Sequence, residues 1–598
     1  MKSVEIILAT FLFLGCYTSE ALPSEATLAG NNPLQARLHG SAMGPEDILP
    51  PEDETKVIAA CVTCQVAISL IEGELDLGAP IDYLIQEGII ICVSIVGYTQ
   101  TFCDGFVPLV APILYHIFTT NDVDSADFCG MVMSAWGCNT TDPSRDWSVD
   151  IHGEKPPVIP ISLPDPDQPT LKVLHLADTH LDLLYVPGSN AACDNELCCR
   201  EESGTPGSPE DEAWFWGDYR HCGSPKWMLE DMLRNIVSEH PDVSYVLWTG
   251  DLVPHNMWST SVEWNTQIIK TTNEMIRTYF PGIPVFPVAG NHEMSPLDEY
   301  PNPEDRPAEL AADWLYQTFL EEWLQIVPQG LDNSTVLHAG YYSILFKPGF
   351  RIISVNSMFG YTANVWLAEN STDIASELAW LETQLNQAEA AGELVHLLGH
   401  IPPGILYAER TWSREYNRII RRYENIIRGQ FFGHTHYDEF EVFHEGGRPI
   451  GVAYIAPSQT PWNSFNPAYR IYTIDGDRPD TTRMVLDLSM YIMNLTEAHQ
   501  TNVSRWFELY NAKIDYGMAS LTSDDWHDLG IRMAENRTLF DLYWRNYVNA
   551  ADPYLEVGCD DICYEKRLCD FMTSDRNDLD ACYKVVQKMK KAQGLLEK

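Results

Sequence analysis

Five short apolar runs in the middle of the chain set its predicted fold. Each has the length and composition of a buried strand. Between them, apolar residues recur at helical spacing around 227–238, 262–279 and 374–391. This alternation predicts an α/β sandwich-like core with flanking helices, over residues 171–475. The five runs are Leu171–Ala177, Tyr245–Thr249, Val285–Ala289, Val395–Leu398 and Gln430–Phe432.

Each run delivers potential metal ligands where the strand ends. A single Asp-x-His is commonly a solvated loop pair, but five such strand ends are hard to obtain by chance. Oxygen and imidazole ligands without thiolates suit a hard or borderline divalent ion. Seven candidates, one of them a carboxylate free to bridge, suit two ions that activate water at a phosphoryl centre. The candidate ligands are Asp178, His180, Asp251, Asn291, His400, His434 and His436.

The N-terminus has the pattern of a secretory signal. Lys2 supplies the charge, Ile6–Leu14 the apolar core, and small residues near Ser19–Ala21 the cleavage zone, so we predict a signal peptide over residues 1–21. No later apolar run has the uninterrupted length of a membrane span. We therefore expect no transmembrane segment in the mature chain, which is either secreted or lysosomal.

Cysteine usage fits the same compartment. Of 15 cysteines, Cys16 lies in the predicted signal, and an even number remains for disulfides. Cys193, Cys198, Cys199 and Cys222 lie in an insertion after the first strand, and Cys559, Cys563, Cys569 and Cys582 lie near the C-terminus. Candidate glycosylation sites are Asn139, Asn333, Asn370, Asn494, Asn502 and Asn536.

Two further regions flank the predicted core. Residues 57–142 carry helically spaced apolar residues and six cysteines, which in a secreted chain favour disulfides over zinc. Six cysteines allow fifteen pairings, and spacing alone does not choose among them. Residues 143–170 are rich in proline and predict a semi-rigid linker. Residues 476–598 predict a helical, disulfide-tied subdomain. The six cysteines of the first region are Cys61, Cys64, Cys92, Cys103, Cys129 and Cys138.

Charge narrows the possible partners. The 85 acidic and 38 basic residues give a formal net charge of -47, which argues against nucleic acid as a partner. Residues 57–142 contain no Lys or Arg. Partial protonation would relieve this self-repulsion, so an acidic compartment fits the composition, and we expect this region to dock to anionic membranes more strongly as the pH falls.

The five strand-end motifs match, in order, those of the calcineurin-like metallophosphoesterases. Asp178-x-His180, Gly250-Asp251, Gly290-Asn291-His292-Glu293, Gly399-His400 and Gly433-His434-x-His436 carry this resemblance. It implies one metal on Asp178, His180 and His436, a second on Asn291, His400 and His434, and Asp251 as the bridge. The secreted setting and the many histidines indicate two zinc ions.

The region 57–142 resembles the saposin domain. The resemblance implies four or five helices, the pairs Cys61–Cys138, Cys64–Cys129 and Cys92–Cys103, and an apolar face that engages lipid. The stretches 89–91 and 106–110 could supply that face or fill the core of a small helical cap.

The domain order, with the motifs at Gly250–Asn256 and Asn466–Arg470, resembles the acid sphingomyelinases. This resemblance implies hydrolysis of sphingomyelin to ceramide and phosphocholine at acidic pH, on sphingomyelin-containing membrane surfaces. We expect in-line attack by hydroxide, with His292 as general acid and His255 assisting. Trp462 could contact choline by a cation–π interaction or could be plain packing. We expect a monomer.

Two alternatives remain at this point. The first is a related secreted phosphodiesterase that acts on nucleotides or other phosphodiesters. The second is a lipid-binding protein whose metal site is vestigial. The saposin-like region weighs against the first, because a soluble nucleotide needs no lipid-handling module. The complete ligand set, with His255 and His292, weighs against the second.

Overall fold

The structure is a computed structural model that describes residues 54–121, 123–140, 142–304 and 306–595. The predicted signal peptide lies outside these residues. Two six-stranded sheets form the core, with strand orders β14-β13-β12-β1-β4-β5 and β10-β11-β9-β8-β7-β6. The first contains β1 (Thr170–Leu176), β4 (Val243–Trp248), β5 (Val285–Pro287), β12 (Ala468–Asp475), β13 (Val485–Met493) and β14 (Trp506–Asn511). The second contains β6 (Tyr342–Lys347), β7 (Phe350–Ser354), β8 (Leu394–Leu398), β9 (Ile427–Phe432), β10 (Glu439–Glu445) and β11 (Arg448–Ile455).

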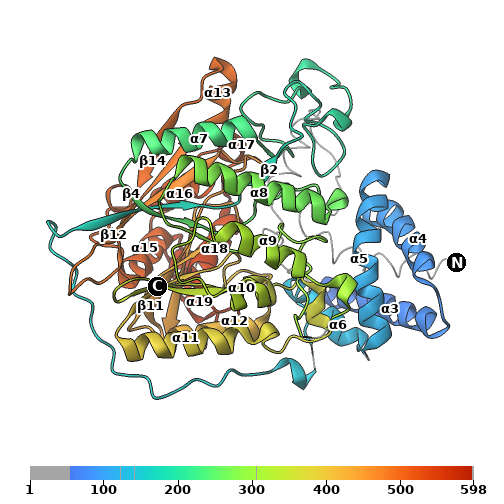
Figure 1. The fold of residues 1–598 in the computed structure, drawn as a ribbon, viewed down its shortest axis with the longest axis horizontal. Helices are drawn as coiled ribbons and strands as arrows, with labels where there is room; N and C mark the ends of the chain where they lie inside the picture. Colours follow the sequence, from blue (N-terminus) through green and yellow to red (C-terminus); the bar gives the residue numbers. More distant parts are fainter. Residues whose placement is uncertain (1–53, 122, 141, 305, 596–598) are drawn as a thin grey trace.

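The two sheets pack face to face between layers of helices. The rings of Tyr472 on β12 and Phe431 on β9 meet across the interface at 5.2 Å. Helices α7 (Lys226–Glu239) and α8 (Val262–Tyr279) cover the first sheet, and α11 (Glu377–Ala391) and α12 (Arg410–Arg422) cover the second (Figure 1). The predicted α/β sandwich-like core with flanking helices is therefore confirmed.

Parallel pairing matters most for the function of this sandwich. Strands β1, β4 and β5 run parallel to one another, as do β7, β8 and β9. Parallel strands end at the same edge of a sheet, so their following loops meet. Shorter elements complete this region, namely β2 (Leu181–Asp182), β3 (Ser224–Pro225), α9 (Asp313–Trp323) and α10 (Asn333–Ala339).

The N-terminal helical unit is tied by three disulfides. It contains α3 (Glu54–Asp76), α4 (Ile81–Ile91), the π-helical turn η2 (Cys92–Val96), α5 (Gln100–Thr120) and α6 (Ser125–Val132). The pairs are those that the saposin resemblance implies, Cys61–Cys138, Cys64–Cys129 and Cys92–Cys103. By length and composition, residues 57–76 and 100–120 are also apolar enough to cross a membrane, a test that core helices of soluble domains also pass.

One candidate lipid face of this unit is buried. Phe106, Val107 and Val110 on α5 pack in a core cluster with Met257 and Leu297 of the catalytic region. The same helix approaches the turn η7 (Met257–Ser259), where Phe102 contacts Trp258 at a ring distance of 5.9 Å. The stretch 106–110 therefore fills an interface between the two regions, whereas Ile90 is exposed.

The proline-rich segment 143–170 lies along the catalytic region (Figure 1). Trp147 and Val149 pack in the cluster beneath α11 and α12. The backbone amide of Val149 donates to Glu415 at 3.0 Å, and that of Ile159 donates to Asn425 at 2.9 Å. The segment is therefore anchored at several points on the second sheet's helix layer.

The first sheet continues beyond residue 475, the predicted end of the catalytic domain. Strands β13 and β14 extend the first sheet beyond it by antiparallel pairing. The sequence of β13 explains this extension. The more exposed Asp487 and Ser489 alternate with buried Leu488 and Met490, which is the pattern of a strand within a mostly helical stretch. The helices after residue 475 are α13 (Leu495–Thr501), α14 (Ala512–Asp515), α15 (Ser523–Glu535), α16 (Arg537–Tyr547), α17 (Asp552–Val557), α18 (Asp561–Met572) and α19 (Asp580–Ala592).

Candidate metal centre

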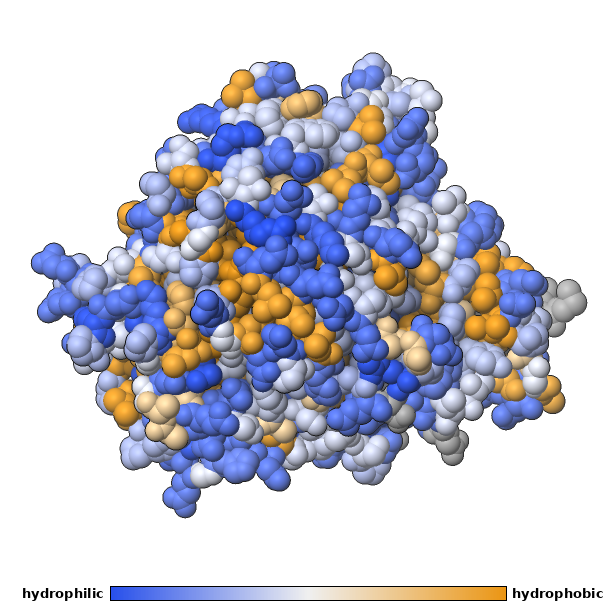
Figure 2. Space-filling view, in the orientation of Figure 1, coloured by the Kyte–Doolittle hydropathy of each residue, from blue (hydrophilic) through white to orange (hydrophobic). Residues whose placement is uncertain are grey.

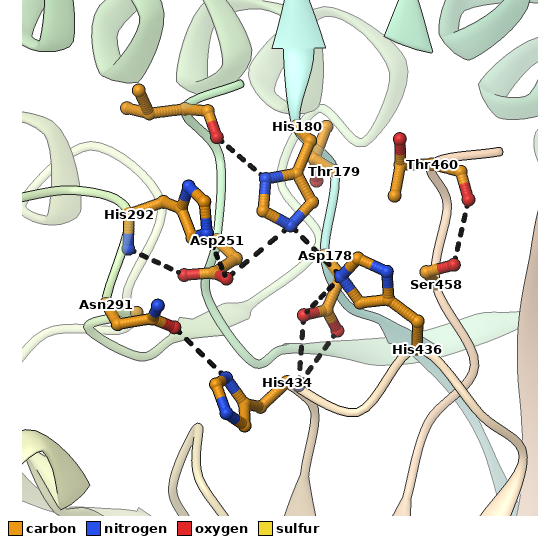
Figure 3. Close-up of polar contacts among 12 residues, drawn as sticks. Asp178, Thr179, His180, Asp251, Asn291, His292, His434, His436, Ser458 and Thr460 are labelled. Carbon is orange, nitrogen blue, oxygen red and sulfur yellow. Dashed lines mark hydrogen bonds and ion pairs between the residues drawn. The ribbon is translucent and has the colours of Figure 1, made fainter. Parts of the chain in front are cut away.

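All seven predicted metal ligands meet where the parallel strands end, and Figure 3 labels all of them except His400. Asp178 and His180 follow β1, Asp251 follows β4, and Asn291 follows β5. The remaining three come from the second sheet. His400 follows β8, and His434 and His436 follow β9. The tertiary fold thus brings ligands from both sheets to one edge of the sandwich.

Strained backbone aims several of these side chains. Asp178, His180, Asp251, His434 and His436 all have left-handed φ angles between 41° and 74°. Non-glycine residues rarely adopt this conformation, because Cβ crowds the backbone, and such strain persists at sites where surrounding structure holds it. The clustering of five left-handed residues within one site therefore marks it as functional.

Glycines make room between the motifs. A Cβ on Gly290 would lie 2.2 Å from Asp251 Oδ1, and a Cβ on Gly250 would lie 2.8 Å from the amide nitrogen of Gly290. The loops after β4 and β5 are therefore in direct backbone contact, an approach that no larger residue permits.

One group of ligand atoms gathers around Asn291. His400 Nε2 lies 2.9 Å and His434 Nδ1 lies 3.1 Å from Asn291 Oδ1. His400 Nε2 is also 3.2 Å from Asp251 Oδ2. Asp251, His400 and His434 form one set of potential ligands whose atoms all lie within 4.8 Å of one another.

A second group gathers around His180. His180 Nε2 lies 3.2 Å from His436 Nε2 and 3.5 Å from Asp251 Oδ2. His436 Nε2 is 3.6 Å from Asp178 Oδ1. Asp251 contributes to potential ligand sets with His180 and with His400, the position that a bridging carboxylate requires.

Backbone carbonyls orient two of the imidazoles. His180 Nδ1 lies 2.7 Å from the carbonyl oxygen of Val253, and His400 Nδ1 lies 2.6 Å from that of Thr249. Each Nδ1 therefore carries a proton and donates it to a carbonyl, which leaves Nε2 of both rings facing the site. This second-sphere arrangement is typical of metal-bound histidines.

Electrostatics keep most of this donor set in its binding form. Burial is the largest cause of three lowered pKa values. It lowers the pKa of His180 to about 3 and lowers the pKa values of His434 and His436 well below the ordinary value. Burial would raise the pKa of Asp251, but the nearby histidines, His400 foremost, hold it well below. Neutral imidazoles and an ionised carboxylate are the forms that coordinate a cation, so the residues fit a pair of divalent ions.

Asp178 and His400 are the exceptions in this set. Burial raises the pKa of Asp178 well above its ordinary value. Burial lowers the pKa of His400, but the carboxylate of Asp251 outweighs that effect and raises it to about 9. A bound divalent cation would stabilise the carboxylate of Asp251 in place of the proton on His400. Metal binding should therefore release this proton.

His255 and His292 lie beside the ligands. The ring of His255 is 4.0 Å from that of His180, and His292 Nε2 is 4.0 Å from Asp251 Oδ2. The backbone amide of His292 donates to Asp251 Oδ1 at 3.0 Å. His255 Nδ1 is buried and has no hydrogen-bond partner among the described residues. Both imidazoles are therefore within reach of a substrate at the metal centre.

Trp462 belongs to this site, but one face of its ring is covered. It stacks on His255 with a ring distance of 3.8 Å and an interplanar angle of 5°, and it is 4% exposed. Its Nε1 donates to the carbonyl of Glu196 at 3.5 Å. Trp462 therefore packs against His255 with one face of its ring. Its contact with choline remains a prediction.

Two supporting residues were missed from the sequence. Glu293 accepts hydrogen bonds from the backbone amides of Gly290, Asp251 and Leu252, which joins the loops after β4 and β5. Asp298 Oδ1 accepts from Asn291 Nδ2 at 2.8 Å, which turns the amide oxygen of Asn291 toward the histidines. Glu293 stands within a recognised motif, but nothing in the sequence pattern marks Asp298.

The other predicted residues lie away from the site. The insertion cysteines pair as Cys193–Cys198 and Cys199–Cys222, and the C-terminal ones as Cys559–Cys563 and Cys569–Cys582. Asn494 is partly exposed. The other candidate glycosylation sites are exposed, namely Asn139, Asn333, Asn370, Asn502 and Asn536.

Comparison with known proteins gives the family. Residues 171–438 match the family described as calcineurin-like phosphoesterase, and residues 448–589 match the acid sphingomyelin phosphodiesterase C-terminal region. A sphingomyelin phosphodiesterase of Bos taurus is 35% identical over 85% of this chain and 81% of that protein. One of Homo sapiens is 33% identical over 78% and 74%, respectively. Sphingomyelin phosphodiesterase 2 of Caenorhabditis elegans is 34% identical over 76% and 78%.

These matches span the sandwich, the strand-end ligands and the C-terminal helices. The chain therefore belongs to the sphingomyelin phosphodiesterase family, within the calcineurin-like metallophosphoesterases.

Proposed function

We propose that this protein hydrolyses sphingomyelin to ceramide and phosphocholine. The observation that carries the proposal is the meeting of seven candidate metal ligands with His255 and His292 at one edge of the sandwich. Relatives named as sphingomyelin phosphodiesterases align over most of their own length and support the choice of substrate. Seven disulfides support residence in the secretory pathway, either outside the cell or in lysosomes.

Two zinc ions are the proposed cofactors. Asp178, His180 and His436 would hold one, and Asn291, His400 and His434 the other. Asp251 would bridge them, as its place between the two groups suggests. A ligand set with four imidazoles and no thiolate favours zinc over magnesium or calcium, which prefer all-oxygen sites.

The chemical role of the bound ions is to acidify the attacking water and to neutralise the phosphoryl oxygens. The reaction breaks the bond between phosphorus and the ceramide oxygen, and the oxygen of water forms the new bond to phosphorus. The departing ceramide oxygen must gain a proton. His292 is the proposed donor, because its Nε2 lies 4.0 Å from Asp251 at the edge of the metal centre. His255, stacked against Trp462, would stabilise the developing charge.

The N-terminal unit is the proposed membrane contact. Four apolar side chains at four-residue spacing stay exposed on α3, and this lobe carries apolar surface (Figure 2). Their exposed fractions are 57% for Ile58, 50% for Val62, 48% for Val66 and 44% for Leu70. Such a stripe on one helix face is suited to insertion at a lipid surface.

Parallel assays test the proposed reaction. Purified protein should release phosphocholine from sphingomyelin liposomes, most rapidly in acid, and a chelator should abolish the release. Activity confined to a nucleotide phosphodiester would favour the first alternative enzyme. No chelator-sensitive activity on either substrate would leave a lipid-binding protein with a vestigial site.

Liposome co-sedimentation of the full chain tests the membrane contact. Binding to anionic liposomes should strengthen as the pH falls from neutral toward about 5, because fewer carboxylates are ionised. The double variant Val62→Ser/Val66→Ser should weaken it. The control Ile514→Ser changes an apolar residue outside this unit that is 79% exposed, more than Val62 or Val66. Equal binding at both pH values, or equal loss in the control, would contradict the proposal.

A further inference from the structure

A cavity lies at the end of β9 opposite to the loop that carries His434 and His436. It has a volume of about 200 Å³ and is bounded by the start of β9, by β11, by linker residues 158–161 and by the first turn of α15. Arg428 lines it, six residues before His434. At about 3.3 Å per residue, the cavity is roughly 20 Å from the metal centre. It is therefore separate from the site described above.

Arg428 brings an uncompensated charge to this cavity. Its Nη2 donates to the carbonyl of Asn425 at 2.6 Å, but its Nε is buried and has no acceptor among the described residues. Burial lowers the pKa of Arg428 to about 10. Among the described residues no carboxylate forms an ion pair with Arg428, which leaves the partly buried guanidinium able to bind an anion.

A second donor stands beside it on the same face of β9. Gln430 is 1% exposed, and its Oε1 accepts from the hydroxyl of Tyr416 at 2.9 Å. Its Nε2 is buried and has no acceptor among the described residues. A buried amide donor without a partner is destabilising, so a ligand that accepts a hydrogen bond from it is favoured. Residues two apart on a strand point the same way, which directs both donors to one side.

A glycine keeps the space beside this amide open. A Cβ on Gly451 of β11 would lie 3.6 Å from Gln430 Nε2, and the backbone at Gly451 is not left-handed. The strand itself therefore does not require glycine there. The first turn of α15, whose helix dipole favours negative charge, forms another wall through Thr522 and Ser523.

The remaining walls are largely apolar. Val158, Ile159 and Ile161 of the linker face Ile450 and Leu521. Two acidic residues line the cavity. Glu424 is paired with Arg448 at 2.8 Å and with Lys155 at 3.3 Å, and Asp524 lies in the first turn of α15. A ligand that fits this cavity therefore needs an oxyanion that accepts from Arg428 and Gln430 and a short apolar group that contacts linker residues 158–161.

We propose that this cavity binds a small amphiphilic oxyanion, a carboxylate or phosphate monoester with a short alkyl chain, through Arg428 and Gln430. The oxyanion accepts from the guanidinium Nε and from the amide Nε2. The alkyl chain contacts linker residues 158–161. Because those residues connect the N-terminal unit to the sandwich, an occupied cavity would also fasten the linker to the second sheet. This site does not depend on the proposed substrate.

Isothermal titration of the full-length, zinc-loaded protein tests the proposal. Octanoate and hexyl phosphate serve as probes, and inorganic phosphate serves as the probe without an alkyl chain. Hexyl phosphate or octanoate should bind saturably to one site. Tighter binding of the first identifies a phosphate site, and tighter binding of the second identifies a carboxylate site. No saturable binding of either probe, or binding of inorganic phosphate as tight as that of hexyl phosphate, would overturn the proposal.

Variants locate the binding. Arg428→Met should weaken the preferred probe by about tenfold or more, as expected for the loss of one charged hydrogen bond. Gly451→Ala places a methyl group at an ordinary contact distance from the amide, so it should keep the fold and still weaken binding. Arg234→Met, at a position with a 64% exposed side chain on α7, should leave the affinity unchanged. Unaltered affinity in both cavity variants would refute the site.

Discussion

A buried ion pair behind the metal centre allows a quantitative prediction. Arg470 on β12 is 1% exposed, and Asp438 is 3% exposed. Arg470 Nε donates to Asp438 Oδ1 at 3.0 Å, and Nη2 donates to the carbonyl of Ile455 at 2.8 Å. Asp438 lies two residues beyond the candidate ligand His436 and also accepts from the hydroxyl of Tyr510. The pair therefore joins the first sheet to the loop that carries a metal ligand.

The variant Arg470→Met leaves the carboxylate of Asp438 buried without its counter-charge. Removing one partner of a buried ion pair costs about 3–5 kcal/mol. Burial already raises the pKa of Asp438 and Arg470 opposes that effect, so the pKa should rise further in the variant. For a cooperative unit of about 400 residues, 1 kcal/mol shifts the unfolding midpoint by roughly 1 °C, so the midpoint should fall by about 3–5 °C.

Differential scanning fluorimetry of the zinc-loaded protein measures this change, and elemental analysis follows the metal content. The double variant Arg470→Met/Asp438→Leu removes both charges and should regain most of the lost stability, because no buried charge is left alone. Arg505→Met, with a 68% exposed side chain, is the control. The reasoning is refuted if the single variant melts with the wild type, or if the double variant is as unstable as the single one.

Four further predictions concern the site and the core. His292→Ala should lower turnover on sphingomyelin by roughly 10²–10⁴-fold while elemental analysis still finds both metals; loss of metal instead would indicate an orienting role. Gly290→Ala places a Cβ 2.2 Å from Asp251 Oδ1 and should reduce bound metal and activity together. Chelation should abolish activity, and added zinc should restore it more fully than magnesium does. Burial lowers the pKa of His396 to about 4 in the folded chain. At a pH between this value and the ordinary pKa of 6.5, the imidazole is therefore protonated in the unfolded chain and neutral in the folded chain. Relative to His396→Gln, the wild type should therefore lose about 2 kcal/mol between neutral pH and pH 5, measured by denaturant unfolding at both pH values.

The local sequence was enough to predict each strand-end motif. An apolar strand, a glycine and a ligand residue lie within a few positions of one another, as at Val285–Asn291. Their chemistry identifies a metal site, because Asp, Asn and His without cysteine suit divalent ions. The disulfide count, the helical N-terminal unit and the α/β alternation also follow from local composition.

Long-range contacts decided what the pattern left open. The stretch 106–110 is equally suited to a lipid face or a core, and it is buried because Met257 and Leu297 cover it. The alternating pattern of β13 predicts a strand, whereas the neighbouring segments are helical. Antiparallel pairing with β12 makes this segment a strand.

The orientation of the site also came from the tertiary structure. His180 and His400 present Nε2 because carbonyls 73 and 151 residues away in the chain hold their Nδ1 atoms. Asp298 positions Asn291 through a turn that no pattern marks. A sequence determines which groups are available, since residue chemistry is local. Which atoms face one another depends on packing between distant segments, and only the folded chain brings those segments together.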